Sequence, residues 1–88
     1  MRIILSRAAA RALDRLDRPT EARLRAAVDR LAEAPMTRAP GRDVRPLAAA
    51  EGLWRLRVGD WRVIYVVHEG EKRVYVLAVR PRGGAYRP

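Results

Sequence analysis

The chain contains no cysteine and only one histidine, His68. A disulfide framework and a thiolate metal site are therefore excluded, and a zinc site built by this chain alone is not expected. No apolar run approaches the length of a membrane span, and the N-terminal residues MRIILSRAAARAL reach charge too early for a secretory signal. These absences predict a cytoplasmic protein that uses no metal or other cofactor.

The motifs of the common catalytic sites are also missing. No glycine-rich loop precedes an expected helix, and neither a carboxylate pair nor a Ser/His/Asp set can be assembled from the spacing. His68 is followed by Glu69 in an expected turn, and we interpret it as a solvated turn histidine. The candidate functional residues must therefore be sought among the positive charges.

Positive charge is abundant in this small protein. The 88 residues carry a formal net charge of +9 and a sequence pI of about 11.5. The length predicts one domain over residues 1–88, without room for a second core. A domain this basic is expected to bind a polyanion, either nucleic acid or an acidic protein segment. Arginine greatly outnumbers lysine, and guanidinium groups favour bidentate recognition of phosphate and carboxylate.

The first half of the chain predicts a strand followed by two helices. Residues 2–5 (RIIL) are β-prone, and Ser6 is a suitable N-cap for a helix over residues 7–16. Pro19 suits the first turn of a second helix, which Pro35 ends.

Residues 36–50 contain prolines and a glycine and show no clear period. We interpret this segment as a connector along one edge of the domain, with Val44 and Leu47 packed against the core.

The segment from Gly52 to Val67, GLWRLRVGDWRVIYVV, predicts a β-hairpin. Gly59-Asp60 suits a two-residue type II′ turn, with glycine first. This turn places Val58 opposite Trp61 and sets the register of the remaining pairs. Because strand side chains alternate between faces, one face of the hairpin is entirely apolar and is expected to be core; it comprises Trp54, Leu56, Val58, Trp61, Val63 and Tyr65.

The opposite face of this hairpin carries Arg55, Arg57 and Arg62, with Arg57 directly across from Arg62. Like charges that face each other across a ladder are destabilising, which suggests that an anion binds between them. A solvated sheet face that carries the pair by chance is the alternative.

A last strand over residues 73–79 and a flexible basic tail from about residue 80 to residue 88 complete the chain. The expected order is β-α-α-β-β-β, an α+β fold in which a two-helix hairpin packs on one face of a four-stranded, mainly antiparallel sheet. Arg80 and Arg82 lie near the end of the last strand, and Tyr86 follows Arg82 by four residues. A cluster of arginines with one tyrosine would suit RNA held by a phosphate and a neighbouring base.

The hairpin block, the following VYVLAV, and the pair Arg82 and Tyr86 resemble the RelE/ParE superfamily of bacterial type II toxin–antitoxin toxins. The preceding segments LAEAP and GRDVRPL are similar to the connector of that family. RelE-like members are ribosome-dependent endoribonucleases that cut mRNA without a metal, through attack of the ribose 2′-hydroxyl on the adjacent phosphate. ParE-like members instead inhibit DNA gyrase.

The resemblance implies roles for individual residues. Arg62 matches an arginine that contacts the scissile phosphate, Arg82 an arginine near the end of the last strand, and Tyr86 a tyrosine that supports the reacting nucleotide. These three are the candidate catalytic residues, and the candidate RNA-binding residues are Arg55, Arg57 and Arg80. The general base stays unassigned, since an arginine with a pKa above about 12 cannot readily accept a proton.

Three functions follow as hypotheses. The first is a toxin that cleaves mRNA on the ribosome, the second a gyrase inhibitor, and the third a basic binding module without toxicity. The pair Arg82 and Tyr86 favours the first. Under either toxin hypothesis the resemblance implies a cognate antitoxin protein as partner, with DNA contacted only through that antitoxin and with no membrane involved.

Overall fold

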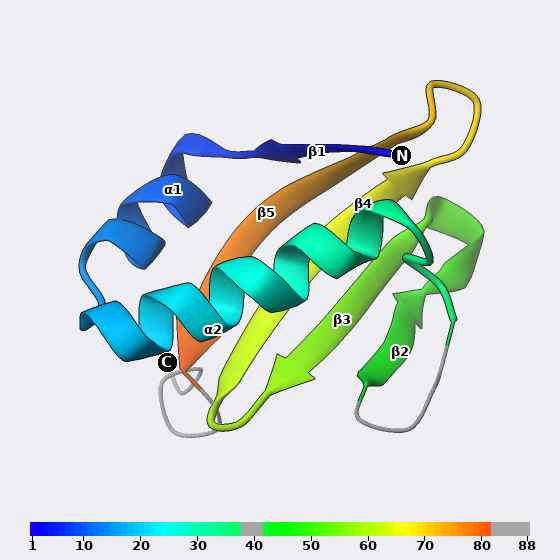
Figure 1. Cartoon of the computed structure of the whole chain (residues 1–88). Coiled ribbons are helices and arrows are strands. Elements are labelled where there is room, and N and C mark those ends of the chain that lie inside the picture. The colour runs from blue at the N-terminus through cyan, green and yellow to red at the C-terminus, as the bar shows by residue number, and fades with distance from the viewer. Residues whose placement is uncertain (38–41, 82–88) are drawn as a thin grey trace, which may run out of the picture.

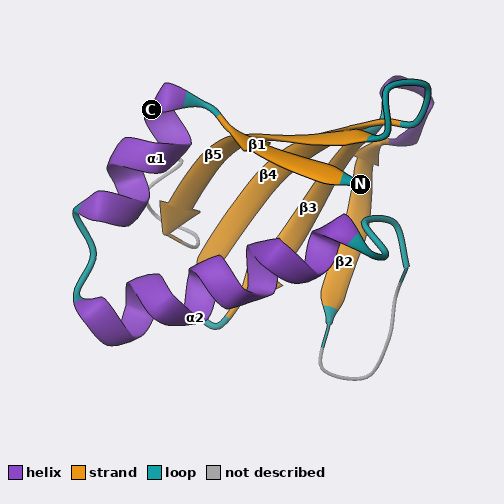
Figure 2. Ribbon diagram, turned by 45° about the horizontal axis from the view of Figure 1, so that its top comes forward, coloured by secondary structure: helices purple, strands orange, loops and turns teal. Residues whose placement is uncertain are grey.

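A computed structural model describes residues 1–37 and 42–81. Its elements are β1 (Arg2–Leu5), α1 (Arg7–Asp14), α2 (Arg18–Asp29), the 3-10 turn η1 (Arg30–Ala32), β2 (Asp43–Ala48), the 3-10 turn η2 (Ala49–Glu51), β3 (Leu53–Val58), β4 (Trp61–His68) and β5 (Arg73–Pro81). The two helices lie on the same side of the sheet, and α2 crosses β4 and β3 (Figures 1 and 2). Within the described residues, no helix is long and apolar enough to cross a membrane.

The strands form one mixed sheet in the order β1-β5-β4-β3-β2. β1 is parallel to β5, and the other neighbours are antiparallel. The expected α+β class is confirmed, as is the order of one strand, two helices and then further strands. The expectation of four strands is wrong, because the described sheet has five and four of them, not three, follow the helices. The additional strand is β2, which lies within the segment interpreted as a connector.

The strand β2 was not predicted from the sequence because it contains a proline and a register shift. Pro46 has no backbone N–H, which an edge strand tolerates because one side of its ladder has no partner strand. The register with β3 shifts between Pro46 and Ala48, so the alternation of side chains stops after four residues. As expected, Val44 is buried in the core, whereas Leu47, expected to pack there, is 53% exposed.

Each of the two helices begins after a residue whose side chain caps its N-terminus. The Ser6 hydroxyl accepts a hydrogen bond from the backbone N–H of Ala9 at 3.0 Å, which confirms Ser6 as the N-cap of α1. Asp17 caps α2 by accepting from the backbone N–H of Thr20 at 3.1 Å, and Pro19 lies in the first turn.

The hairpin of β3 and β4 has the expected register. Val58 pairs with Trp61, Arg57 with Arg62 and Trp54 with Tyr65. Gly59 has a φ of 57°, and Asp60 does not have a positive φ, the combination that distinguishes a type II′ turn from type I′. The hairpin prediction is therefore confirmed residue by residue.

The core lies between the helices and the apolar face of the sheet. It combines residues of α1, α2 and η1 with alternate residues of the strands. Tyr65 is fully buried, and its hydroxyl donates a hydrogen bond to the carbonyl of Pro35. Trp54, Val58 and Trp61 pack against this core as expected but are only partly buried.

The last strand is longer than expected and ends at Pro81. Arg80 and Pro81 therefore belong to β5, where the sequence analysis placed the start of a flexible tail. Arg82 and Tyr86, together with the remainder of that expected tail, lie outside the described residues.

Candidate anion-binding site on the open sheet face

The open face, defined as the sheet face opposite the helices, receives every second residue of the strands. Leu56 and Val63 point into the core, so their neighbours Arg57 and Arg62 point to the open face. By the same alternation Asp43 and Arg45 flank the buried Val44. No helix within the described residues covers this face (Figure 2).

Three arginines form a line across this face, one residue in from the β3–β4 turn. Arg57 on β3 is the register partner of Arg62 on β4, and Arg62 is the register partner of Arg80 on β5. Side chains directly opposite each other on neighbouring strands have Cβ atoms about 4.5–5.5 Å apart. This arginine row (Arg57, Arg62 and Arg80) brings together three of the residues that the sequence analysis selected.

Arg55 lies on the same face but is fixed by an acid. It is 9% exposed, and its Nη2 donates to Asp43 Oδ1 at 3.0 Å. The exposed Arg45 has its Nε 3.7 Å from the same carboxylate oxygen. Asp43 therefore holds Arg55 against the sheet and also attracts Arg45 toward the arginine row.

A shallow pocket of about 330 Å³ lies over the end of this face. Its lining residues come from the three neighbouring strands β2, β3 and β4; they are Asp43, Arg45, Pro46, Leu47, Arg55, Arg57 and Arg62. Guanidinium groups that converge on a pocket suit a phosphate or carboxylate ligand. The described chain has no group of three His, Cys, Asp or Glu side chains that could hold a metal ion.

The sequence analysis missed Asp43 and Arg45 because it did not recognise β2 as a strand. The signal is the short alternation of Asp43, Val44 and Arg45, in which one apolar residue separates two charged residues. Arg82 and Tyr86 stay sequence-based candidates, since the structure does not describe them.

The other end of the open face holds His68. Its Nδ1 accepts a hydrogen bond from the backbone N–H of Glu71 at 3.1 Å, which closes the β4–β5 turn. The Tyr75 hydroxyl donates to Glu71 Oε1 at 2.7 Å, and this hydrogen bond lowers the pKa of the Glu71 carboxyl. The described partners of His68 thus serve the turn, which agrees with its interpretation as a turn residue.

The buried face has one titratable group with a changed pKa. Burial raises the pKa of the Tyr65 hydroxyl to about 12, against a smaller opposing effect of Arg42 and Arg55. Tyr65 is therefore neutral and serves as a core residue with one internal hydrogen bond.

The chain is similar to known toxins over nearly its whole length. Residues 3–86 match the family described as the ParE toxin of the type II toxin–antitoxin system parDE. A protein named Toxin RelE from Mycobacterium tuberculosis (strain ATCC 25618 / H37Rv) is 33% identical over 86 residues, which cover 97% of this chain and 84% of the relative.

Solved structures share the fold. The archaeal RelE–RelB complex from Pyrococcus horikoshii OT3 contains a chain with 33% identity and a TM-score of 0.81, with 94% of this chain and 96% of that chain covered. A chain of the intact E. coli RelBE toxin–antitoxin complex has 15% identity and a TM-score of 0.71, with coverages of 93% and 95%, and shows the fold alone. The chain therefore belongs to the RelE/ParE superfamily and is a toxin of a type II toxin–antitoxin system.

Proposed function

We propose that this toxin is RelE-like and cleaves mRNA on the ribosome. The observation that carries the proposal is the arginine row, which lies across β3, β4 and β5 on the face that the helices leave uncovered. Identity of 33% to Toxin RelE of M. tuberculosis over almost the whole chain supports the RelE-like branch.

In the proposed reaction the ribose 2′-oxygen attacks the adjacent phosphorus and the bond from phosphorus to the 5′-oxygen breaks. The 2′-hydroxyl loses its proton, the departing 5′-oxygen gains one, and the products are a 2′,3′-cyclic phosphate and a free 5′-hydroxyl. Negative charge grows on the phosphoryl oxygens during this step. Fixed guanidinium donors stabilise such charge most effectively when they are oriented before the reaction starts.

The residues of the arginine row and their neighbours would have different roles in this reaction. Arg62, central in the row, would contact the scissile phosphate, with Arg57 and Arg80 on its two sides. Arg55 would add positive charge near the phosphate without binding it directly, because its guanidinium already donates a hydrogen bond to Asp43. Arg82 and Tyr86 would supply a further phosphate contact and support for the reacting nucleotide, as the family resemblance implies.

The proposed partners are the ribosome with its mRNA and a cognate antitoxin. The relatives from P. horikoshii and E. coli are found in complexes with RelB. A positively charged toxin would attract an acidic antitoxin segment and increase its association rate. Contact with DNA would then be indirect, through the antitoxin.

Gyrase inhibition is the second candidate function. The family profile that matches residues 3–86 is that of the ParE toxin, which favours this alternative. A gyrase inhibitor would act by protein contact and would leave RNA intact.

A translation extract separates the two candidates. The purified protein is added to an extract that translates a defined mRNA, and new 5′ ends are mapped by primer extension with and without ribosomes. We expect discrete cuts that require ribosomes, and at least a hundredfold loss of cleavage in Arg62→Gln, because removal of one transition-state donor costs about 10²–10³ in rate. Arg11→Gln removes the same charge from the exposed side of α1 and should cleave normally.

Intact mRNA would refute the proposal, and a supercoiling assay with gyrase would then test the alternative. Equal cleavage by the folded Arg62→Gln variant and the parent would show that the arginine row is not the reaction site.

A further inference from the structure

A carboxylate continues the arginine row on the open face. Asp43 on β2 is the register partner of Arg57, and Arg62 is the partner of Arg57 on the other side. Residues directly opposite each other on neighbouring strands lie on the same face, with Cβ atoms about 4.5–5.5 Å apart. One acid and three arginines therefore form a single row across β2, β3, β4 and β5.

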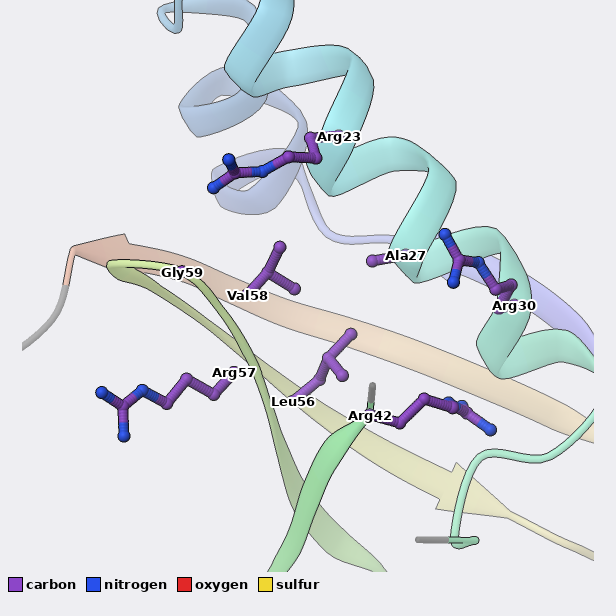
Figure 3. Close-up of a pocket in the computed structure, with 8 residues that line it drawn as sticks. All are labelled: Arg23, Ala27, Arg30, Arg42, Leu56, Arg57, Val58 and Gly59. Atoms are coloured by element: carbon purple, nitrogen blue, oxygen red, sulfur yellow. The ribbon is translucent and has the colours of Figure 1, made fainter. Parts of the chain in front are cut away.

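Arg57 links this acid to the rest of the row on the side away from the helices. In Figure 3 its side chain extends away from α2, whereas those of Leu56 and Val58 point toward that helix. Together with Asp43 and Arg62 it lines the pocket of about 330 Å³ on the open face, and Asp43 is the only acid among the described residues of that lining. A phosphate bound between Arg57 and Arg62 would therefore have a carboxylate on the adjacent strand, about 4.8 Å further along the row.

The two oxygens of this carboxylate have different surroundings. Oδ1 of Asp43 accepts a hydrogen bond from Arg55 Nη2 at 3.0 Å and lies 3.7 Å from Arg45 Nε. Oδ2 accepts no hydrogen bond from any residue in the ranges 1–37 and 42–81. The side chain is 42% exposed, so a ligand can reach it. Arg55 thus fixes the carboxylate through one oxygen and leaves the other oxygen as an available acceptor.

The other titratable groups are remote from the row or already engaged. His68 lies six residues beyond Arg62 on β4, about 20 Å along an extended strand, and its Nδ1 already accepts the backbone N–H of Glu71. Tyr65 is buried on the opposite face, where burial raises its pKa to about 12. Asp60 lies in the β3–β4 turn and does not line the open-face pocket. Among the described residues, the best placed proton acceptor for a ligand in this pocket is therefore the acid of the row.

We propose that Asp43 is the general base of RNA cleavage and that Arg55 positions it. The assignment rests on the proposed function, in which the general base was left unassigned. Oδ2 takes the proton of the ribose 2′-hydroxyl while the 2′-oxygen forms its bond to phosphorus. The bond from phosphorus to the 5′-oxygen breaks, and the 5′-oxygen takes a proton from water. The hydroxide left by that water removes the proton from the carboxyl group, so that atoms and charge balance over one cycle.

The two neighbouring arginines make a carboxylate compatible with a phosphate site. An uncompensated acid beside a phosphate would repel it. Arg55, which is 9% exposed, and Arg45 both lie next to Oδ1 and offset the charge of Asp43. The carboxylate can therefore remain beside the arginine row without weakening the attraction of the row for phosphate.

The test measures cleavage of a defined mRNA on purified ribosomes, with the full-length protein in excess over the ribosome-bound mRNA. We expect Asp43→Asn to lower the maximal rate at least a hundredfold, because positioned acid–base groups contribute about 10²–10⁴ in rate. The half-saturating protein concentration should change less than about threefold, since the arginine row is intact. Asp14→Asn removes an acid from another ion pair, 3.3 Å from Arg25 on the helix side, and should cleave like the parent.

Arg55→Gln separates a general base from an acid that merely holds an arginine in place. This variant breaks the same ion pair but keeps the carboxylate. We expect it to lose less than about tenfold in maximal rate, much less than Asp43→Asn. Equal losses in the two variants would mean that Asp43 acts through Arg55 alone and would overturn the proposal. Urea midpoints of both variants verify that they are folded in the assay.

The conservative variant Asp43→Glu provides a readout that does not depend on the ion pair. It keeps a carboxylate on a longer side chain, whereas Asp43→Asn keeps the shape and an acceptor for Arg55 but loses the basic group. We expect Asp43→Glu to cleave at least about tenfold faster than Asp43→Asn. A glutamate variant no faster than the asparagine variant would contradict the assignment of the base.

The same assay distinguishes failure of this assignment from failure of the proposed function. If the parent cleaves and Asp43→Asn cleaves at the same maximal rate, the base is another group and the proposed function stands. If the parent leaves ribosome-bound mRNA intact, the proposed function is refuted and the assignment of Asp43 is refuted with it.

Discussion

Leu56 and Arg57 are neighbours in sequence, yet they face different environments on the two sides of strand β3. Leu56 is 3% exposed and packs under α2, while Arg57 is exposed and belongs to the arginine row. Along this strand, residues that secure the fold alternate with residues that present charge. Substitutions on the buried face should therefore change the free energy of unfolding, and those on the open face should change ligand binding. Arg55 is the exception, since it lies on the open face but is nearly buried against Asp43.

The largest loss of stability is expected for Leu56→Ala. Truncation of a buried leucine leaves a cavity and costs about 2–5 kcal/mol in the free energy of unfolding. Urea denaturation followed by circular dichroism measures this loss. Leu47→Ala is the matched control, because Leu47 is 53% exposed and its truncation should change the free energy by less than about 0.5 kcal/mol. Similar losses for the two variants would contradict the assignment of the faces.

Trp61→Ala should have a smaller effect than the loss of a fully buried aromatic residue. Trp61 packs against the core but is only partly buried. We expect a loss below about 3 kcal/mol and a protein that still folds. The same urea titration checks this, and complete unfolding of the variant in buffer would mean that Trp61 is as central to the core as Leu56.

Asp43→Asn tests the exception on the open face. It removes the charged acceptor of the nearly buried Arg55, which should cost about 1–3 kcal/mol. Arg45→Gln removes the weaker contact at 3.7 Å, where both groups are well exposed, and should cost less than about 1 kcal/mol. Equal stability of Asp43→Asn and the parent in urea would show that Arg55 does not depend on this pair.

Tyr65→Phe should lose about 1 kcal/mol at neutral pH, because the hydroxyl donates to the Pro35 carbonyl. The pKa of Tyr65 is raised to about 12 in the folded protein, above the value of about 10 in the unfolded chain. The unfolded state therefore loses its proton first, and the parent loses stability as the pH rises from about 10 to about 12. The variant lacks this loss, so its deficit should shrink in urea titrations above pH 10; a constant deficit would contradict the raised pKa.

Arg57→Gln should have the smallest effect on stability, within about 0.5 kcal/mol, since its side chain is exposed. It removes one of two like charges that face each other across the ladder, so a slight stabilisation is expected. If this variant loses RNA cleavage while its urea midpoint is unchanged, the open face serves ligand binding and the buried face serves stability. A large drop in the midpoint would place Arg57 among the residues that hold the fold.

The hairpin was predictable from sequence because its signals are local. Gly59-Asp60 specifies the turn, the turn sets the register, and alternation then assigns each residue to a face. That chain of reasoning gave the pairing of Arg57 with Arg62 and the burial of Leu56. The depth of burial of Trp61 could not be predicted from the turn and the alternation, because it depends on where the helices end above the sheet.

The strand β2 and the site residues on it were not predictable from the same signals. Pro46 and the register shift that follows it hide a short edge strand, and Asp43 was therefore not recognised as the partner of Arg55. A pocket of about 200 Å³ bounded by α2, the start of β2 and the end of β3 was also missed, because Arg23 and Arg42, which both line it, are distant in sequence and are brought to one pocket only by tertiary packing.

The position of β5 in the sheet affects the order in which this protein is assembled during translation. A ribosome produces β1 first and β5 after every other described element, yet the neighbour of β1 in the sheet is β5. The strand β1 therefore stays unpaired until the rest of the described chain has emerged from the ribosome. Pairing between strands so far apart in sequence slows folding. Arg80 arrives with β5 as well. Until then the nascent chain has neither the complete five-stranded sheet nor the complete arginine row, so the described fold cannot form before this last strand is synthesised.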